Sequence, residues 1–341
     1  MPEPTANTAL DASGETKPNL VLARTARVKA LAGEIGFDLI GIAPPALPEA
    51  FARYTAAMGQ GYGADMGWLY ERPELREDAR NVWPETQSVI VVGVSYASDT
   101  PGYLADPPEA DEGWIARYAQ GKDYHVYVRD RLIRLVKAIA ADPLLAHAGP
   151  STAHRIFSDT GPVLEKAYAQ AAGVGWIGKH SLMIHKGEGS WFFLGVVLTP
   201  LALQPDTPAT DHCGSCSRCM EVCPTDAIVR PYVVDARKCI ATWTIESPAP
   251  AAVIDPEPLG QHIFGCDLCQ EVCPWNRKST PSVHTPLLPR EANIRPKLET
   301  LHGLSDADFR KRFPKSSVRR VKTHQMTEVI DVIRDRGGTV E

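Results

Sequence analysis

The chain has 341 residues, 44% of them hydrophobic, and a formal net charge of −5. This length and composition are typical of a soluble globular protein with two or three units, and the negative charge argues against a general nucleic-acid-binding protein. Residues 1–20 are polar and predict a disordered lead-in, and no apolar run suits a signal peptide or a membrane helix. A cytoplasmic location without membrane contact is therefore expected.

Residues 21–199 predict one domain of mixed helices and strands, because helical periodicity alternates with short apolar runs. The helices are expected at 21–35, 48–58, 124–140 and 163–172. The strands are expected at 37–43, 88–96, 155–158 and 191–198. The run SVIVVGVSY at 88–96 is almost continuous in apolar residues, which is typical of a strand buried on both faces.

Three features of this domain suit either a ligand or an ordinary structural role. The segment GQGYGADMGWL at 59–69 is rich in glycine and aromatic residues, so it either holds a flat ligand or makes a turn. Asp159 lies between a predicted strand and a predicted helix, where it either caps the helix or faces a ligand. Asp123 precedes the helix at 124–140 and is expected to cap it.

All eight cysteines lie in one module, residues 213–276, which follows a proline-containing linker at 200–212. The first run reads C-x2-C-x2-C-x3-C-P, the second repeats it without its first cysteine, and one isolated cysteine lies between them. This spacing is typical of a ferredoxin-like module with two 4Fe–4S clusters, in which the cysteine beside the proline binds the other cluster. The eight cysteines are Cys213, Cys216, Cys219, Cys223, Cys239, Cys266, Cys269 and Cys273.

We assign these cysteines to two sets of four. The first set comprises Cys213, Cys216, Cys219 and Cys273, and the second comprises Cys223, Cys239, Cys266 and Cys269. The alternatives are a pair of zinc ribbons, which usually have separated C-x2-C pairs, and a disulfide framework, which belongs to small secreted chains. Neither alternative fits the spacing. Residues 277–341 lose strand character and predict a small helical tail packed on the module, with helices at 306–313 and 325–334.

The chain resembles the epoxyqueuosine reductase family, whose members are cobalamin-dependent iron-sulfur enzymes of tRNA queuosine synthesis. The resemblance is carried by KDYH at 122–125, DTGPVLEK at 159–166, AGVGWIGK at 172–179 and the two cysteine runs. It implies a cobalamin-binding domain of α+β class at 21–199, similar to nitroreductase-like folds, followed by the two-cluster ferredoxin-like module and the small helical C-terminal tail. A monomer is expected.

The reaction implied by the resemblance is the two-electron reduction of the epoxide of epoxyqueuosine in tRNA to the alkene of queuosine. Cobalamin would receive electrons from the two clusters, which an external low-potential donor would reduce. The leaving oxygen has to be protonated, and Asp159 matches the proton donor of the family. A proton donor at neutral pH needs a raised pKa, so Asp159 is expected to be buried beside the cobalamin.

The resemblance also implies contacts, although ordinary surface or core packing would explain each of these residues as well. The expected cobalamin contacts are Arg76, Lys122, Tyr124, His125, Asp159, Lys179 and Met183. The expected tRNA phosphate contacts are Arg319, Arg320 and Lys322, in a basic run at 310–322 that otherwise reads as a solvated face. The sequence RRVK at 319–322 lacks an arginine-asparagine pair of the family, which leaves the details of tRNA docking open.

Three other functions remain as alternatives. A reductive dehalogenase uses the same two cofactors, but such enzymes commonly carry a twin-arginine export signal, which residues 1–20 do not contain. A plain electron carrier would need neither cobalamin nor Asp159. A metal-free binding module is hard to reconcile with eight ordered cysteines.

Overall fold

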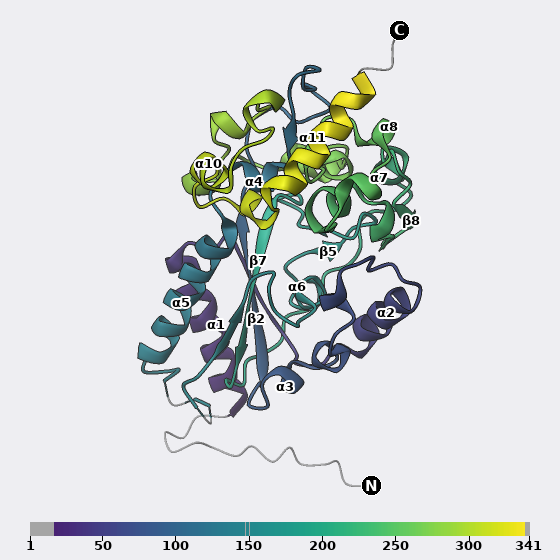
Figure 1. Ribbon diagram of the computed structural model, residues 1–341. Coiled ribbons are helices and arrows are strands. Elements are labelled where there is room, and N and C mark those ends of the chain that lie inside the picture. Colours follow the sequence, from purple (N-terminus) through teal and green to yellow (C-terminus); the bar gives the residue numbers. More distant parts are fainter. Residues whose placement is uncertain (1–16, 147, 150, 338–341) are drawn as a thin grey trace.

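The computed structural model describes residues 17–146, 148–149 and 151–337. Most of the predicted lead-in, residues 1–16, lies outside this range, and the first helix, α1 (Lys17–Ile35), begins earlier than the predicted residue 21. Helices and a central sheet together make up the fold, as the α+β prediction requires (Figure 1).

The N-terminal part is built around a four-stranded antiparallel sheet with the strand order β1-β2-β7-β4. Its strands are β1 (Leu39–Ala43), β2 (Ser88–Ser95), β7 (Phe192–Thr199) and β4 (Arg155–Phe157). β2 pairs with β7 along its whole length and is buried throughout. The four predicted strands are confirmed, with small shifts at their ends.

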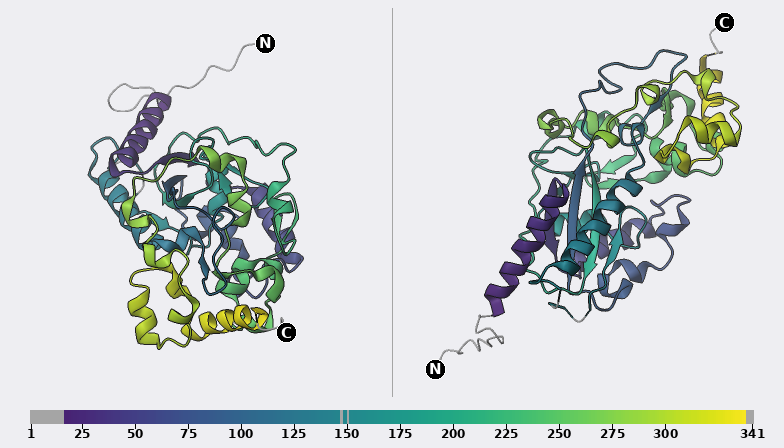
Figure 2. Two further views of the ribbon diagram at one scale, coloured as in Figure 1. Left: turned by 90° about the horizontal axis from the view of Figure 1, so that it is seen from above. Right: turned by 90° about the vertical axis from the view of Figure 1, so that its left-hand side faces the viewer.

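Helices cover both faces of this sheet. α1 and α5 (Tyr124–Ala141) cover one face, where Ile90 of β2 belongs to the core beneath them (Figure 2). α6 (Glu165–Ala171) covers the other face, where the next residue of β2, Val91, belongs to a second core. Successive side chains of a strand point to opposite faces, so a strand as apolar as β2 serves both cores at once.

The remaining elements are short, apart from α2 and α11. The other helices are α2 (Pro48–Gly59), α3 (Ala79–Val82), α4 (Arg117–Gln120), α7 (Arg218–Glu221), α8 (Pro256–Leu259), α9 (Leu268–Glu271), α10 (Asp306–Arg312) and α11 (Thr323–Gly337). The other strands form three pairs, β3 (Trp114–Ile115) with β10 (His262–Phe264), β5 (Trp176–Ile177) with β6 (Met183–Ile184), and β8 (Ile228–Arg230) with β9 (Val233–Val234).

The cysteine module contacts the rest of the chain on two sides. β10 of the module pairs in parallel with β3, which comes from the long loop after β2. Phe309 of α10 and Ile330 of α11 share a core with Ile263 and Phe264 of the module. The prediction of a helical tail packed on the module is therefore confirmed. Among the residues that the structure describes, no helix has the length and apolar composition that a membrane crossing requires.

Candidate functional site

Asp159 lies in the turn between β4 and α6, in a backbone conformation that is unusual for its residue type. Its φ of 65° places it in the left-handed region, which is costly for residues other than glycine and often marks a functional site. Its backbone N–H donates to Oε1 of Glu165 at 2.8 Å. Leu164, and not Asp159, occupies the N-cap of α6. The capping alternative for Asp159 is therefore wrong.

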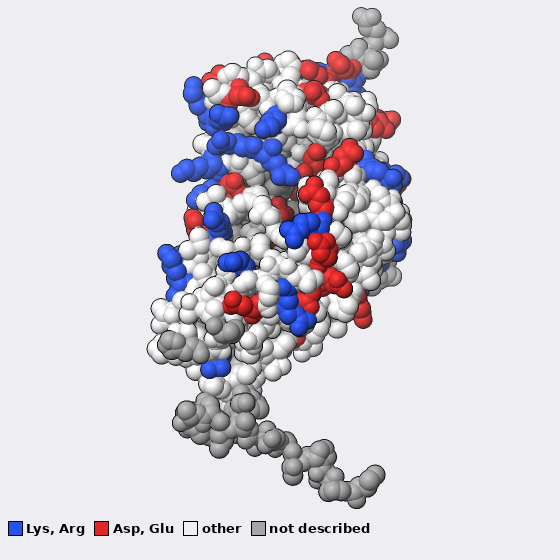
Figure 3. Space-filling model, turned by 60° about the horizontal axis from the view of Figure 1, so that its bottom comes forward, with Lys and Arg blue, Asp and Glu red and all other residues white. Residues whose placement is uncertain are grey.

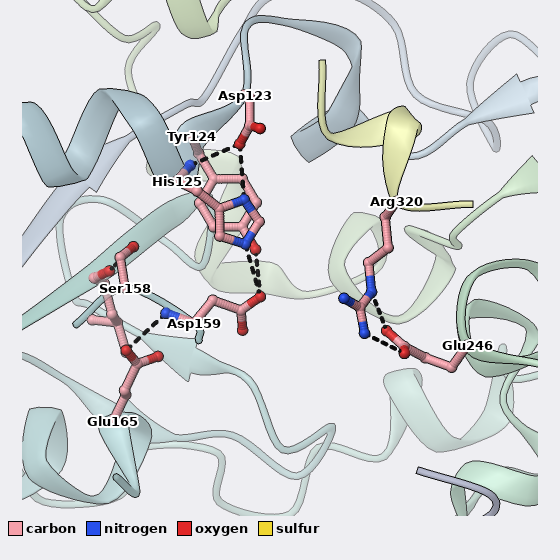
Figure 4. Close-up of polar contacts among 9 residues, drawn as sticks. Asp123, Tyr124, His125, Ser158, Asp159, Glu165, Glu246 and Arg320 are labelled. Carbon is pink, nitrogen blue, oxygen red and sulfur yellow. Dashed lines mark hydrogen bonds and ion pairs between the residues drawn. The ribbon is translucent and has the colours of Figure 1, made fainter. Parts of the chain in front are cut away.

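The first turn of α5 supplies two partners for the Asp159 carboxylate. The Tyr124 hydroxyl donates to Oδ2 of Asp159 at 2.7 Å, and Nε2 of His125 lies 3.3 Å from the same oxygen (Figure 4). Nδ1 of His125 lies 2.8 Å from Oδ1 of Asp123, whose carboxylate also accepts the backbone N–H of His125 as the N-cap of α5. The predicted Asp123 cap is confirmed, and it fixes the imidazole between two carboxylates.

The proton of this cluster resides on His125. Burial alone would lower the pKa of His125, but hydrogen bonds to Asp123 and Asp159 raise it to about 9. The hydrogen bond from His125 in turn holds the pKa of Asp159 below its ordinary value, against the opposite effect of partial burial. At neutral pH the structure therefore favours an imidazolium between two carboxylates.

The expectation that Asp159 is buried with a raised pKa is wrong for this structure. Its side chain is 62% exposed, and its pKa is lowered. The physical reason is that Tyr124 and His125 both donate hydrogen bonds to the carboxylate, which stabilises the charged form. Asp159 by itself is not a neutral acid here, and the proton that it can pass on is the one held by His125.

Glu165 is a second carboxyl group beside Asp159. Burial raises its pKa to about 7, although the N–H of Asp159 partly offsets this effect. One oxygen of Glu165 thus anchors the strained backbone of Asp159, while the carboxyl group itself is close to half-protonated at neutral pH. The sequence places Glu165 six residues after Asp159, and we did not single it out there.

Arginines from the basic run face this cluster. Arg320, at the end of the short 3-10 helix Ser317–Arg320, forms a bidentate ion pair with Glu246 at 3.0 and 2.6 Å. Figure 4 shows this pair and the Asp159 carboxylate on opposite sides of one gap. Arg320 helps to lower the pKa of Asp159, and Arg319 has the same effect on Asp123. The basic run at 310–322 thus borders the cluster of Asp123, His125 and Asp159, and it is not only a solvent-exposed surface.

Charged side chains are unevenly distributed over the surface. On the face shown in Figure 3, Lys and Arg side chains gather toward the upper left, while Asp and Glu side chains form a band near the middle. A chain of net charge −5 therefore still offers a concentrated positive area to an anionic partner.

A cavity of about 260 Å³ lies between the loop after α2 and the π-helix Thr242–Glu246. The loop contributes Gly61, Met66 and Tyr70, and the opposite wall includes Glu246, the partner of Arg320. The segment at 59–69 forms consecutive turns, so the turn alternative is confirmed, and the segment also lines this cavity. The lining combines glycine, thioether and aromatic groups with the charged Asp65, Arg237 and Glu246, which suits one edge of a large ligand that has both apolar and polar parts.

The other expected cobalamin contacts form hydrogen bonds or packing contacts elsewhere in the chain. Arg76 is buried, and its guanidinium donates to the carbonyl oxygens of Trp68 and Glu71. Met183 is buried in the core beneath α6. The Lys179 ammonium group contacts the first cysteine run, and for Lys122 only the backbone is held, by an N–H that donates to the carbonyl oxygen of Pro286. Of the expected contacts, the structure thus brings only Tyr124 and His125 to Asp159.

The first cysteine set surrounds a cavity of about 300 Å³. Cys213, Cys216, Cys219 and Cys273 all line it, together with Lys179, His180 and other residues. The Lys179 ammonium group donates to the carbonyl oxygens of Gly214 and Cys216, which fixes the cysteine loop against the loop after β5. Four thiols around a cavity of this size fit a 4Fe–4S cube, which is larger than a single zinc ion.

The four cysteines of the second set are half-buried, whereas two of the first set, Cys219 and Cys273, are buried. Burial raises the pKa of the Cys269 thiol, and the nearby sulfurs of Cys239 and Cys223 raise it further. The same two causes act on Cys266, whose neighbours are Cys269 and Cys239. Cys269 thus lies near Cys223 and Cys239, and Cys266 lies near Cys269 and Cys239, so the four thiols of the second set also converge.

Comparisons with known proteins agree with this geometry. Residues 212–276 match the family model described as "4Fe-4S double cluster binding domain", and residues 76–160 match "Epoxyqueuosine reductase QueG, DUF1730". A curated relative, the epoxyqueuosine reductase of Synechocystis sp., is 42% identical over 290 residues, which cover 83% of this chain and 96% of the relative.

Two solved structures are similar over most of the chain. A crystal structure of epoxyqueuosine reductase with an epoxyqueuosine-modified tRNA stem loop has a TM-score of 0.78 and 26% identity, and covers 90% of this chain and 80% of that one. A Bacillus subtilis epoxyqueuosine reductase, described with its catalytic loop swung out of the active site, has a TM-score of 0.77 and 25% identity, with the same two coverages.

Proposed function

This chain belongs to the epoxyqueuosine reductase family, and we propose that it reduces the epoxide of epoxyqueuosine in tRNA to the alkene of queuosine. In this reaction both bonds from carbon to the epoxide oxygen break, two electrons and two protons enter, and the oxygen leaves as water. The observation that carries the proposal is the hydrogen-bonded cluster of Tyr124, His125 and Asp159, which faces Arg320 across an open gap.

Electrons are supplied through the cysteine module. We assign one 4Fe–4S cluster to Cys213, Cys216, Cys219 and Cys273, and the other to Cys223, Cys239, Cys266 and Cys269. The match of residues 212–276 to a double-cluster domain supports two clusters, and the cavity among the first four thiols supports this grouping. Each cluster carries one electron at a time, so an external low-potential donor has to deliver two in succession.

Cobalamin is the proposed cofactor at which the electrons meet the substrate. When bound, it supplies a strongly reducing cobalt centre, which no amino-acid side chain can replace. The residues that would hold it are those lining the cavity beside Glu246, namely the loop at 61–70 and the π-helix Thr242–Glu246. Tyr124, His125 and Asp159 lie across the gap from Glu246 and would face the substrate.

The proton follows a path within the chain. His125, which its raised pKa keeps charged at neutral pH, first passes its proton to the Asp159 carboxylate. Asp159 delivers this proton to the epoxide oxygen as its bond to carbon breaks, because an unprotonated alkoxide is a poor leaving group. Solvent returns a proton to His125, and the second proton reaches the oxygen by the same route, so that the oxygen leaves as water. Tyr124 holds the carboxylate in position through its hydroxyl group. Glu165 keeps the turn in the conformation that presents the carboxylate to the gap.

The tRNA is proposed to bind through the basic run. Arg319 and Lys322 are exposed and lie in the segment that contains Arg320, beside the acidic cluster. Phosphates bound there would place a nucleotide base next to Asp159. The partner of Arg320, Glu246, keeps that guanidinium near the gap when no tRNA is bound.

The test is an anaerobic conversion assay with reconstituted protein, cobalamin, a low-potential reductant and an anticodon stem loop that contains epoxyqueuosine. We expect the native protein to form queuosine and Asp159→Ala to lose this activity. Asp130→Ala, at an exposed position on α5, is the matched control and should remain active. Absence of conversion by native protein with both clusters and cobalamin bound would contradict the proposed function.

A further inference from the structure

His180 presents an unpaired hydrogen-bond donor to the cavity of the first cysteine set. The residue is 3% exposed and lines the same cavity as the four thiols. The backbone N–H of Leu182 donates to Nδ1 of His180 at 3.1 Å, so Nδ1 is the acceptor and the proton of the neutral ring lies on Nε2. In the part of the chain that the structure describes, Nε2 is buried and has no hydrogen-bond partner.

Trp176 presents a second donor beside the same cysteines, although it does not line the cavity itself. It is 1% exposed, and its buried indole N–H has no nitrogen or oxygen acceptor among the described residues; the side chain that it faces is that of Cys213. It belongs to a small apolar cluster that includes Cys273 and Cys213, and its ring packs edge-on against Trp275 with centroids 4.9 Å apart. Trp176 and His180 come from one segment, in and just after β5, that lies against the cysteine loop.

Two buried N–H groups without partners are costly, and native structures rarely keep them without a reason. Both donors lie beside the four thiols that we assign to one cluster. The sulfurs of a 4Fe–4S cluster accept N–H hydrogen bonds, and such bonds help to set its reduction potential. The missing acceptor at this cavity is therefore the cluster itself.

We propose that His180 and Trp176 are positioning residues that donate N–H···S hydrogen bonds to the cluster of Cys213, Cys216, Cys219 and Cys273 and raise its reduction potential. The inference rests on the cysteine assignment made under the proposed function. Reduction adds negative charge to the cluster, so each N–H group stabilises the reduced form more than the oxidised form. The second cluster, which lacks these two donors, is unaffected and serves as an internal reference.

The experiment is a redox titration of the full, reconstituted chain, followed by electron paramagnetic resonance, in the absence of cobalamin and tRNA. His180→Phe and Trp176→Phe each keep a ring and remove the N–H donor. In each variant we expect one of the two midpoint potentials to fall and the other to stay unchanged. A fall of about 59 mV corresponds to a tenfold change in the one-electron reduction equilibrium. Trp83→Phe, a buried tryptophan in the core beneath α6, is the matched control and should move neither potential.

A second measurement uses the unmodified protein, in case a variant fails to assemble its clusters. With 15N-labelled histidine, the reduced first cluster should show a hyperfine coupling to one imidazole nitrogen. Unchanged potentials in both variants at full iron content, or no histidine coupling in the native protein, would overturn the inference. Neither result depends on conversion of epoxyqueuosine, so the proposed function would still stand.

Discussion

The site around Asp159 and the cavity of the first cysteine set satisfy their polar groups in different ways. At Asp159 the hydrogen bonds run within the chain, from Asp123 through His125 to one oxygen of the carboxylate, which Tyr124 also contacts. Beside the first cysteine set, the N–H groups of His180 and Trp176 have no nitrogen or oxygen acceptor among the described residues. The first region can therefore store a proton without any ligand, whereas the second needs an inorganic group to complete it.

This difference assigns one task to each region. The exposed carboxylate of Asp159 remains accessible to a substrate, and its hydrogen-bond partners keep it charged until the substrate arrives. The cysteine cavity is lined by the four thiols together with the basic side chains of Lys179, Arg218 and Lys278, which suits a negatively charged cluster. Under the proposed function, proton transfer and electron transfer are therefore prepared in separate regions and meet only at the substrate.

The largest effect is expected from Cys219→Ser, which removes a buried ligand of the first set. The iron content should fall by about half, since one of the two proposed clusters is lost, and conversion of epoxyqueuosine should stop. Iron analysis and the conversion assay measure the two effects. Full iron content in this variant would contradict the assignment of Cys219 as a cluster ligand.

The next effect concerns the anchor of Asp159. Glu165→Ala removes the acceptor of the Asp159 backbone N–H, and kcat should fall by about 10²-fold, because the carboxylate is then misplaced. Glu165→Gln keeps an oxygen that can accept this N–H, so it should recover most of the activity. Equal losses in both variants, with cluster content unchanged, would show that the ionisation of Glu165 matters and not its hydrogen bond.

The same Glu165→Gln variant has a predictable effect on stability. Because burial raises the pKa of Glu165 in the folded state to about 7, the native chain loses stability as the pH rises from the ordinary glutamate pKa through this value. The variant cannot ionise and avoids this loss. Its thermal midpoint should therefore exceed that of the native protein at pH 8 by more than at pH 4, as differential scanning calorimetry would measure.

The smallest effect is expected at the basic run. Arg319→Gln and Lys322→Gln should each weaken binding of the anticodon stem loop and lower the slope of log K against log salt by about one unit. Arg53→Gln, an exposed position on α2, should leave both quantities unchanged. Salt-independent binding of the native protein would rule out phosphate contacts by this segment.

Sequence spacing predicts the cysteine region better than the Asp159 site, because the cluster ligands are concentrated in two short runs with few residues between neighbours. The sequence marks Asp159 as a candidate site residue, but its charge state depends on His125, which lies 34 residues away in the chain. The ion pair between Arg320 and Glu246 joins positions 74 residues apart, and no local pattern signals it.

The fold shows the same difference between features that a local sequence pattern predicts and features that depend on distant residues. The apolar run at 88–96 was sufficient to predict a strand buried on both faces, since burial there is a property of the residues themselves. The pairing of β3 with β10 was not predicted, because each strand has only two or three residues and the contact depends on the packing of the whole module.

The central claim, that His125 supplies the proton which Asp159 delivers, is tested most directly by the pH dependence of a single turnover in fully reduced protein. The account predicts a level rate from neutral pH upward and a fall as the pH passes about 9, where His125 loses its proton. In His125→Phe the fall should move to lower pH. A native rate that already falls at about pH 4 to 5, the ordinary range of a carboxyl group, and an unchanged profile in His125→Phe would contradict the account.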